Sequence, residues 1–332
     1  MDLAATVAEL QRLAPRLQDY APMDPSWQQA ETRVLAIREQ LRALLSTADG
    51  VHAFRSSDAL QDIKRLVPEV AREQIAELHV ADFVLGLLFV KPFIVFEDVY
   101  RGFGHEYGKE LSKDARESSN NIKSSFVYGE ILFFPFAEAI RYVAPQLPEH
   151  AIFYDLGSGL GKAVIAASLL HPFDQAIGIE ALPPLAACAD KRLASLRRQH
   201  GAATLTDVEF ICGDLLTHKW SDGHVIFCHG TCFNDREWSQ ISLAAEQLPQ
   251  GAFFLSTSHV LQSALFEVVK SIPFRMSWGT ATLYVHRRRR IGRWAAQMLR
   301  GGRATRTDLV EQQQQQQQQA KQEPKKADET RA

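Results

Sequence analysis

The feature that most constrains the fold of this chain is a glycine-rich turn between an apolar run and a helix-like run. The apolar run ends at an acid, and the turn reads Asp155-Leu156-Gly157-Ser158-Gly159-Leu160-Gly161-Lys162. Glycine allows left-handed backbone conformations and leaves space for a ligand beside the chain. Such a turn at the carboxyl end of a buried strand predicts a ligand site at the edge of a parallel sheet.

Short β-rich runs and helix-like runs alternate on both sides of this turn. We expect strands at residues 152–156, 176–180, 208–212, 224–228 and 252–257, and helices at 162–170, 183–200, 235–248 and 260–272. Residues 274–278 and 280–286 are expected to form a closing antiparallel pair. This order predicts an α/β fold over residues 126–290, a doubly wound, Rossmann-like seven-stranded sheet.

The residues before and after this domain have a different character. Residues 1–125 are expected to form an N-terminal helical region and lid, with helical periodicity at 26–46 and 58–78, weak helical character at 1–22, and a polar loop at 99–125. Residues 291–332 are basic and then rich in glutamine, with eight consecutive glutamines from Gln312 to Gln319. Such a composition cannot bury a core, so we expect a disordered tail.

The most apolar stretch of the chain, Val80–Phe96, is interrupted by Asp82, Lys91 and Pro92. Because it is too short and too broken to cross a bilayer, we expect a buried helix followed by a strand, and no membrane partner. The four cysteines do not form a secreted disulfide framework, which favours a reducing compartment. Cys228, His229 and Cys232 lack a second Cys/His pair at zinc-site spacing, so no metal is expected.

Three acids follow the ends of successive expected strands, and together they outline a ligand. Asp155 lies where it can meet an amino group, and Glu180, 25 residues later, can accept hydrogen bonds from two ribose hydroxyls. Asp214, with Leu215 beside it, can accept from the amine of an adenine. Alone, Glu180 could equally be a solvent-facing residue at a strand end, and Asp214 could equally belong to a common Gly-Asp turn. The three together predict one adenosyl ligand along the edge of the sheet.

The spacing of the glycines distinguishes between two kinds of adenosyl ligand. A dinucleotide fingerprint spaces its glycines G-x-G-x-x-G, whereas this chain has G-x-G-x-G directly after Asp155. The pattern therefore favours a nucleoside that carries a sulfonium over one that carries a pyrophosphate. A nicotinamide-dependent oxidoreductase is the disfavoured alternative.

Several segments resemble a known family. Val127-Tyr128-Gly129-Glu130 resembles its entry motif, Asp155-Leu156-Gly157-Ser158-Gly159 its glycine turn, and Gly178-Ile179-Glu180 with Gly213-Asp214 its ribose and adenine acids. Ser277-Trp278 and Tyr284-Val285-His286 resemble its closing strands. The chain is similar to the seven-strand (class I) S-adenosylmethionine-dependent methyltransferases over about residues 126–290. Among these it resembles the disruptor-of-telomeric-silencing family of histone-lysine methyltransferases, which lack a SET domain.

The resemblance implies a set of site residues. The cofactor S-adenosyl-L-methionine would be bound by Tyr128, Gly129, Glu130, Asp155, Gly157, Ser158, Gly159, Gly161, Lys162, Glu180, Asp214 and Leu215. Catalytic roles would fall to His229, Tyr284 and Tyr128. His229 and Gly230 stand where the family typically carries two asparagines. His229 could act as a base, orient the acceptor, or merely cap backbone groups, and Tyr284 and Trp278 could be channel walls or core aromatics.

The activity implied is protein-lysine N-methylation in the nucleus, with histone H3 in nucleosomes as the candidate substrate. The alternatives are a methyltransferase for another protein, an RNA or a small molecule, and a catalytically silent scaffold that binds the cofactor. The alternative location is the cytoplasm. The formal net charge of −2 gives the whole chain no bias towards nucleic acid. Residues 287–306 nevertheless carry eight arginines and no acid, beginning with Arg287-Arg288-Arg289-Arg290. This segment could contact nucleic acid, or it could be a solvated tail or an import signal.

Overall fold

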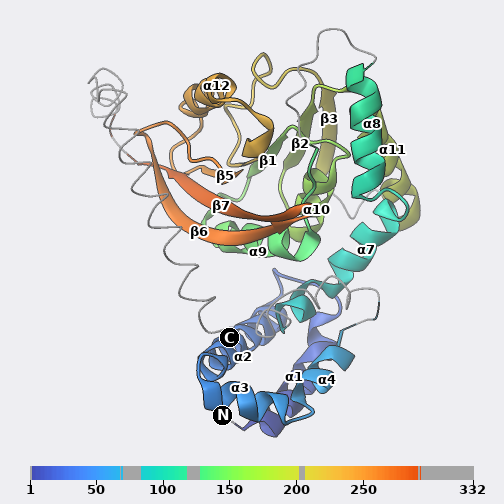
Figure 1. Cartoon of the computed structure of the whole chain (residues 1–332), viewed down its shortest axis with the longest axis vertical. Helices are drawn as coiled ribbons and strands as arrows, with labels where there is room; N and C mark the ends of the chain where they lie inside the picture. The colour runs from blue at the N-terminus through green and yellow to red at the C-terminus, as the bar shows by residue number, and fades with distance from the viewer. Residues whose placement is uncertain are drawn as a thin grey trace. The chain divides into compact units, whose positions relative to one another are not determined.

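The computed structural model of the chain describes residues 2–67, 69, 84–117, 128–201, 206–290 and 292 (Figure 1). It divides into two compact units, one formed by residues 1–101 and 132–140 and the other by residues 102–131 and 141–332. The expected glutamine-rich tail, the start of the α/β domain at 126 and the end of the helix expected at 58–78 lie outside the described residues. The division into 1–125, 126–290 and 291–332 stays a prediction.

The first unit is helical. It contains α1 (Leu3–Leu17), α2 (Pro25–Leu45), α3 (Ala48–Arg55), α4 (Ala59–Arg65), the 3₁₀ helix η1 (Val84–Phe89), α7 (Val90–Tyr100) and most of α9 (Phe133–Val143). Side chains of Asp2, Asp24 and Thr47 accept hydrogen bonds from the first backbone N–H groups of α1, α2 and α3, which satisfies donors that the helices leave open. The strand expected at the end of the Val80–Phe96 run is wrong, because α7 is a helix that buries Phe93 and Phe96 on one face.

The second unit is built on a seven-stranded sheet with the order β3-β2-β1-β4-β5-β7-β6. Its strands are β1 (Ile152–Leu156), β2 (Gln175–Glu180), β3 (Asp207–Cys212), β4 (Val225–Cys228), β5 (Phe253–Thr257), β6 (Phe266–Met276) and β7 (Gly279–Arg288). The first five run parallel, and β7 is antiparallel to both β5 and β6. The expected doubly wound, seven-stranded sheet is confirmed.

The strand order changes direction at β1, which has β2 on one side and β4 on the other. In register, Asp155 of β1 lies opposite Gly178 of β2 and Phe227 of β4. The loops that leave the carboxyl ends of β1 and β4 therefore diverge, and ligands of open α/β sheets bind in the crevice that this leaves.

The helices of the second unit connect the strands and cover the sheet. They are α10 (Lys162–Leu170), α11 (Pro183–His200), α12 (Asp235–Ala245), the 3₁₀ helices η2 (Ala144–Gln146) and η4 (Gly230–Cys232), and α8 (His105–Glu117). In Figure 1, α8 stands beside α11, near the edge of the sheet formed by β3. The loop expected over residues 99–125 is therefore wrong for 105–117. The segment is mostly polar, with Leu111 and Ala115 as apolar residues on its less exposed face, and it is helical where it packs beside α11.

A second correction concerns residues 260–272, which are not a helix. Most of this segment belongs to β6, which pairs with β7 along its whole length in an extended antiparallel hairpin. β6 is the edge strand of the sheet, so Pro273, which cannot donate a ladder hydrogen bond, is tolerated within it. Pairing with the next strand along the chain decided the structure here, and the helix-like spacing of the apolar residues was misleading.

The core of the second unit holds a buried histidine on β7. His286 is 1% exposed, its Nδ1 donates to the carbonyl oxygen of Phe254 (2.9 Å), and its Nε2 accepts from the N–H of Leu261 (3.1 Å). Both ring nitrogens are satisfied only in the neutral form. Burial lowers the pKa of His286 from 6.5 to about 4.

This histidine predicts an acid-sensitive fold. A group whose pKa is lowered by folding adds stability above its unfolded pKa and loses that contribution as the pH falls towards its folded pKa. With values of 6.5 and about 4, His286 alone should cost about 2 kcal/mol of unfolding free energy between about pH 7 and about pH 5. Denaturant unfolding at both pH values should show a smaller loss in His286→Gln, because the amide supplies a donor and an acceptor without titrating. The exposed His52→Gln variant is the control, and an unchanged loss in His286→Gln would contradict the prediction.

Candidate active site

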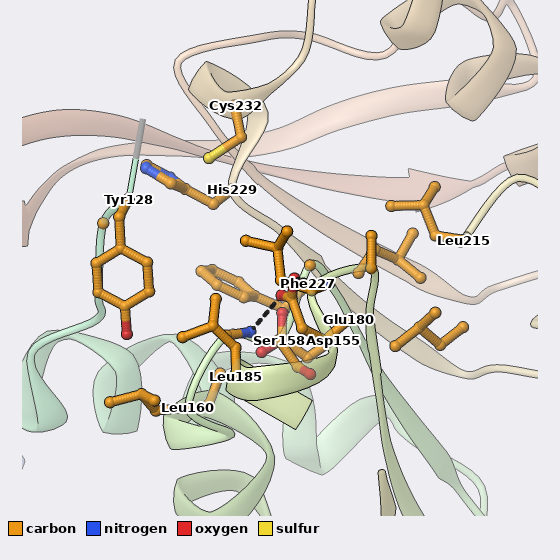
Figure 2. Close-up of a pocket in the computed structure, with 18 of the residues that line it drawn as sticks. Tyr128, Asp155, Ser158, Leu160, Glu180, Leu185, Leu215, Phe227, His229 and Cys232 are labelled. Atoms are coloured by element: carbon orange, nitrogen blue, oxygen red, sulfur yellow. Dashed lines mark hydrogen bonds between the residues drawn. The ribbon is translucent and has the colours of Figure 1, made fainter. Parts of the chain in front are cut away.

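A cavity of about 360 Å³ lies in the second unit at the carboxyl ends of β1, β2 and β4 (Figure 2). Its lining comes from segments distant in sequence: α8, residues 128–131, the glycine turn, the loops after β2, β3 and β4, and the end of β6. In the view of Figure 2, Tyr128 and His229 lie at one end of the cavity and Leu215 at the other, with Asp155 and Glu180 between them.

The glycine turn forms an open cradle. Gly157, Gly159 and Gly161 have φ values of 87°, 54° and 81°, which side chains rarely tolerate. A Cβ added at Gly157 would meet only the ring of Phe233, 3.9 Å away, so bare backbone faces the cavity there. The Oγ of Ser158 is buried and has no hydrogen-bond partner among the described residues. An incoming ligand with polar groups would fit this cradle.

Asp155, at the end of β1, carries a buried carboxyl group that lacks a partner in the described part of the chain. Its side chain is 4% exposed, and no hydrogen bond or ion pair recorded among those residues reaches it. Burial raises its pKa well above the usual value, and the charge of Glu180 raises it further. A buried carboxylate is stabilised by a cation. The amino group or sulfonium of S-adenosylmethionine would supply one.

Glu180, at the end of β2, is held by backbone. Its Oε2 accepts from the N–H of Gly159 (2.8 Å) and its Oε1 from the N–H of Leu182 (2.9 Å). Burial raises the pKa of Glu180, and these backbone hydrogen bonds partly oppose the shift. The carboxylate is therefore fixed in position between the glycine turn and the start of α11, beside Asp155.

Asp214 begins the turn after β3, where Leu215 and Leu216 also line the cavity. Its Oδ1 accepts from the N–H of Leu216 (2.8 Å), which fixes the turn and leaves the other oxygen to accept from a ligand. Ile179, Leu182 and Leu185 line the same cavity. This apolar lining with one acid at its edge is suited to an adenine ring.

Residues 128–130 form a polar network at the other end of the cavity. The Tyr128 hydroxyl donates to Oε1 of Glu130 (2.6 Å), and the Lys162 ammonium donates to its Oε2 (2.6 Å). The side chains of Lys162 and Glu130 are only 13% and 5% exposed. Glu130 also exchanges hydrogen bonds with Ser277, donating its N–H to Oγ (3.0 Å) and accepting from the N–H of Ser277 (2.9 Å). Nothing in the sequence indicated this contact of Ser277 beyond its place beside Trp278.

His229 follows β4 directly and is buried. Its Nδ1 lies 2.6 Å from Oγ1 of Thr257, and its Nε2 lies 2.8 Å from Oγ1 of Thr231. Burial lowers the pKa of His229 to about 4, so the ring is neutral at physiological pH and too weak a base for an ammonium group. Of the roles left open by the sequence, this environment favours orientation of an acceptor.

Aromatic residues surround His229. The ring centroid of Trp278, which is partly exposed at the turn between β6 and β7, lies 5.9 Å from that of His229. A Cβ added at Gly129 would come within 2.6 Å of Nε1 of Trp278 and 2.8 Å of Nε2 of His229, so the backbone of Gly129 is packed against both rings. Burial raises the pKa of the neighbouring Cys232 to about 12, which keeps it a thiol. Phe227 and Phe233 also line the cavity.

The cavity brings together most of the residues expected from the sequence. Eleven of the twelve expected cofactor residues line it, together with His229: Tyr128, Gly129, Glu130, Asp155, Gly157, Ser158, Gly159, Lys162, Glu180, Asp214 and Leu215. Gly161 is not in the lining; it precedes α10 with a positive φ and is packed against Phe210. Tyr284 is not in the lining either, since it is buried on β7 opposite Ser256 of β5.

Other lining residues carried no sequence signal that singled them out. They include Ser112 on α8, Phe227 on β4, Phe233 and Glu237 after β4, and Met276 at the end of β6. Within the described part of the chain, no cluster of three or more His, Cys, Asp or Glu side chains could hold a metal ion. None of the helices in the same residues has the length and hydrophobicity that a membrane span requires.

Residues 112–259 match the family model described as histone methylation protein DOT1. The chain is an S-adenosylmethionine-dependent methyltransferase that resembles DOT1. The matched residues contain the glycine cradle, the three acids and His229 of this methyltransferase, and they make up less than half of its chain.

The methyltransferase also has partial similarity to solved structures. A methyltransferase from Thiobacillus denitrificans in complex with S-adenosyl-L-homocysteine is 23% identical, with 44% of this chain and 54% of that chain covered and a TM-score of 0.31. TrmN from Thermus thermophilus is 18% identical, with 46% and 48% covered and a TM-score of 0.35. The protein yhhF from Escherichia coli is 15% identical, with 47% and 85% covered and a TM-score of 0.38. No curated protein sequence matches the methyltransferase.

Proposed function

We propose that this methyltransferase transfers a methyl group to the side-chain nitrogen of a lysine in a protein, with histone H3 in nucleosomes as the first candidate. The observation that carries the proposal is the match to a histone methylation protein over residues 112–259, which include the cavity residues Tyr128, Asp155 and His229. A nuclear location and a role in chromatin regulation would follow from this substrate.

For methyl transfer, the protein mainly has to align the two reactants and exclude water from them. When bound, S-adenosylmethionine supplies a methyl group that is already activated by its sulfonium. Asp155 would hold the cationic end of the cofactor, Glu180 its ribose and Asp214 its adenine. Lys162 and Glu130 would hold the charged groups of its methionine end, and the backbone of the glycine turn would lie against it.

The end of the cavity at His229 would favour a neutral amine. A lysine side chain must lose a proton before its nitrogen can accept a methyl group, and a poorly hydrated channel favours the uncharged form. Phe227, Phe233 and Trp278 provide apolar surface at this end, and the neutral ring of His229 adds no charge to it. Thr257 and Thr231 engage both ring nitrogens of His229, so the fixed, neutral ring would orient the amine through packing.

A different acceptor is the second candidate, and the pair His229-Gly230 favours it. These residues stand where the resembling family carries two asparagines, and His229 lines the cavity beside aromatic residues. Another protein, an RNA or a small molecule could be the acceptor, and a scaffold that binds the cofactor without turnover is the remaining alternative.

The arginines of the run Arg287–Arg290 differ in burial and in the groups that they contact. Arg288 is buried and donates to the carbonyl oxygens of Leu248 and Glu246, and Arg289 forms an ion pair with Glu267 (3.8 Å). Arg287 lies over the ring of Phe253. We therefore expect any contact with nucleosomal DNA to come from Arg290 and from residues beyond it, rather than from the whole run Arg287–Arg290.

The test is methyl transfer from labelled S-adenosylmethionine to recombinant nucleosomes, free histones, cellular RNA and a fractionated lysate. The proposal expects label on a histone lysine in nucleosomes, located by mass spectrometry and absent with Asp155→Ala. Label only in RNA or in a small molecule would favour the second candidate. Binding of the cofactor with no label in any fraction would favour the scaffold.

A further inference from the structure

Helix α8 contains a glycine whose presence the stability of the helix does not explain. Gly108 lies inside the helix, where glycine is the least favourable residue after proline. A Cβ added at Gly108 would collide with the hydroxyl oxygen and Cζ of Tyr128. The absence of a side chain at this position therefore leaves the space that the tip of the Tyr128 ring occupies.

The opposite edge of the same ring contacts the glycine turn. A Cβ added at Gly159 would lie 3.3 Å from Cε2 of Tyr128 and 3.6 Å from its hydroxyl oxygen. Gly108 approaches the Cε1 edge and Gly159 the Cε2 edge, so the ring tip lies between two stretches of bare backbone. From this position the hydroxyl donates to Glu130, the partner of Lys162.

A second contact links α8 to the same segment. The ring of His105, the first residue of α8, stacks on Tyr128 with centroids 5.8 Å apart and an interplanar angle of 29°. Its Nδ1 lies 2.9 Å from Oγ of Ser277, which in turn accepts from the N–H of Glu130. Ser112, farther along α8, lines the cavity itself.

We propose that α8 is part of the cofactor site, and that Gly108 and His105 are positioning residues that hold Tyr128 and Glu130 at its methionine end. Both residues precede the segment that matches the DOT1 model, and Ser277 follows it. The proposal rests on S-adenosylmethionine as the cofactor. It assigns to α8 control over the affinity for the amino-acid part of the cofactor and none over the affinity for its adenosine part.

The experiment compares Gly108→Ala with Gly104→Ala in the full chain. Gly104 lies just before α8, and a Cβ there would meet nothing within 4 Å, so Gly104→Ala is the matched control. Calorimetry should show that Gly108→Ala weakens binding of S-adenosylhomocysteine at least tenfold and leaves binding of adenosine unchanged. Gly104→Ala should bind both ligands as the wild type does. The melting temperature of Gly108→Ala should not fall below that of the wild type, because alanine is the better helix former.

A second set of variants tests whether Gly108→Ala acts through the ring of Tyr128. In a Tyr128→Ala chain the space beside Gly108 is open, so adding Gly108→Ala should have no further effect on S-adenosylhomocysteine binding. His105→Ala should weaken S-adenosylhomocysteine binding, and His105→Asn should restore part of it through a hydrogen bond to Ser277. An equal loss from Gly108→Ala in both backgrounds, or parallel losses of adenosine and S-adenosylhomocysteine binding, would overturn the proposal. If the wild type bound adenosine but not S-adenosylhomocysteine, the cofactor assignment itself would fail.

Discussion

Replacing Asp155 by alanine is expected to abolish binding of S-adenosylmethionine while the chain stays folded. The carboxylate is 4% exposed at the end of β1, and no other described side chain neutralises it. Removing one partner of a buried charge pair commonly costs about 3 kcal/mol, which corresponds to a loss of affinity of roughly a hundredfold or more. Calorimetric titration with S-adenosylmethionine measures this loss directly.

The stability of Asp155→Ala gives a second and opposite readout. Burial and the charge of Glu180 raise the pKa of Asp155, so the ionised carboxylate destabilises the folded chain in the absence of a cation. The unfolding free energy at neutral pH should therefore be equal to or greater than that of the wild type. Asp190→Ala, an exposed substitution on α11, is the control and should change neither the affinity for S-adenosylmethionine nor the unfolding free energy. Retained affinity in Asp155→Ala would remove this residue from the cofactor site.

Replacing His229 by alanine is expected to lower kcat by about a hundredfold and to change the affinity for the cofactor by no more than about threefold. The ring lies at the end of the cavity opposite Leu215, and hydrogen bonds to Thr257 and Thr231 fix its orientation (Figure 2). Removing a group that positions a reacting atom commonly lowers the rate by a factor of this size. Single-turnover methyl transfer to the acceptor found in the labelling experiment measures the effect.

Two further variants separate orientation from base catalysis at His229. His229→Asn should retain more activity than His229→Ala, because an amide can form hydrogen bonds with both threonine hydroxyls. Thr257→Val removes one of these hydroxyls and should lower kcat by a smaller factor. Since the pKa of His229 is lowered to about 4, its titration should leave the rate unchanged between about pH 6 and about pH 8. A cofactor affinity that falls as far as kcat in His229→Ala would contradict the assigned role.

The parts of the fold that the sequence predicted are those determined by local patterns. The expected ranges for β1, α10 and α11 coincide with the observed ones, because each has its own start and stop signals. Pro183 begins α11 and Gly201 follows it, and the glycine turn separates β1 from α10. The same local pattern predicted that Asp155 and Glu180 lie together in the site, since the carboxyl ends of neighbouring parallel strands meet at one edge of the sheet.

The parts that the sequence missed depend on contacts between one element and another. β6 has apolar spacing that suits a helix, and only its pairing with β7 keeps it extended. α8 has few apolar residues, and the approach of Gly108 to Tyr128 is what places it at the site. Ser277 joins the site through Glu130, 147 residues away in the sequence. Tyr284, an aromatic residue in the right strand, is packed against β5 and not in the cavity.

The measurement that tests this account most directly is titration of the full chain with S-adenosylhomocysteine, compared with its Gly157→Asn variant. Asparagine tolerates the φ of 87° at this position better than other side chains, so the variant should fold while its side chain fills the open cradle. We predict one binding site per wild-type chain, and no binding by Gly157→Asn at an unchanged melting temperature. A wild-type chain that binds no S-adenosylhomocysteine, or two chains that bind it equally well, would contradict the assignment of this cavity to the cofactor.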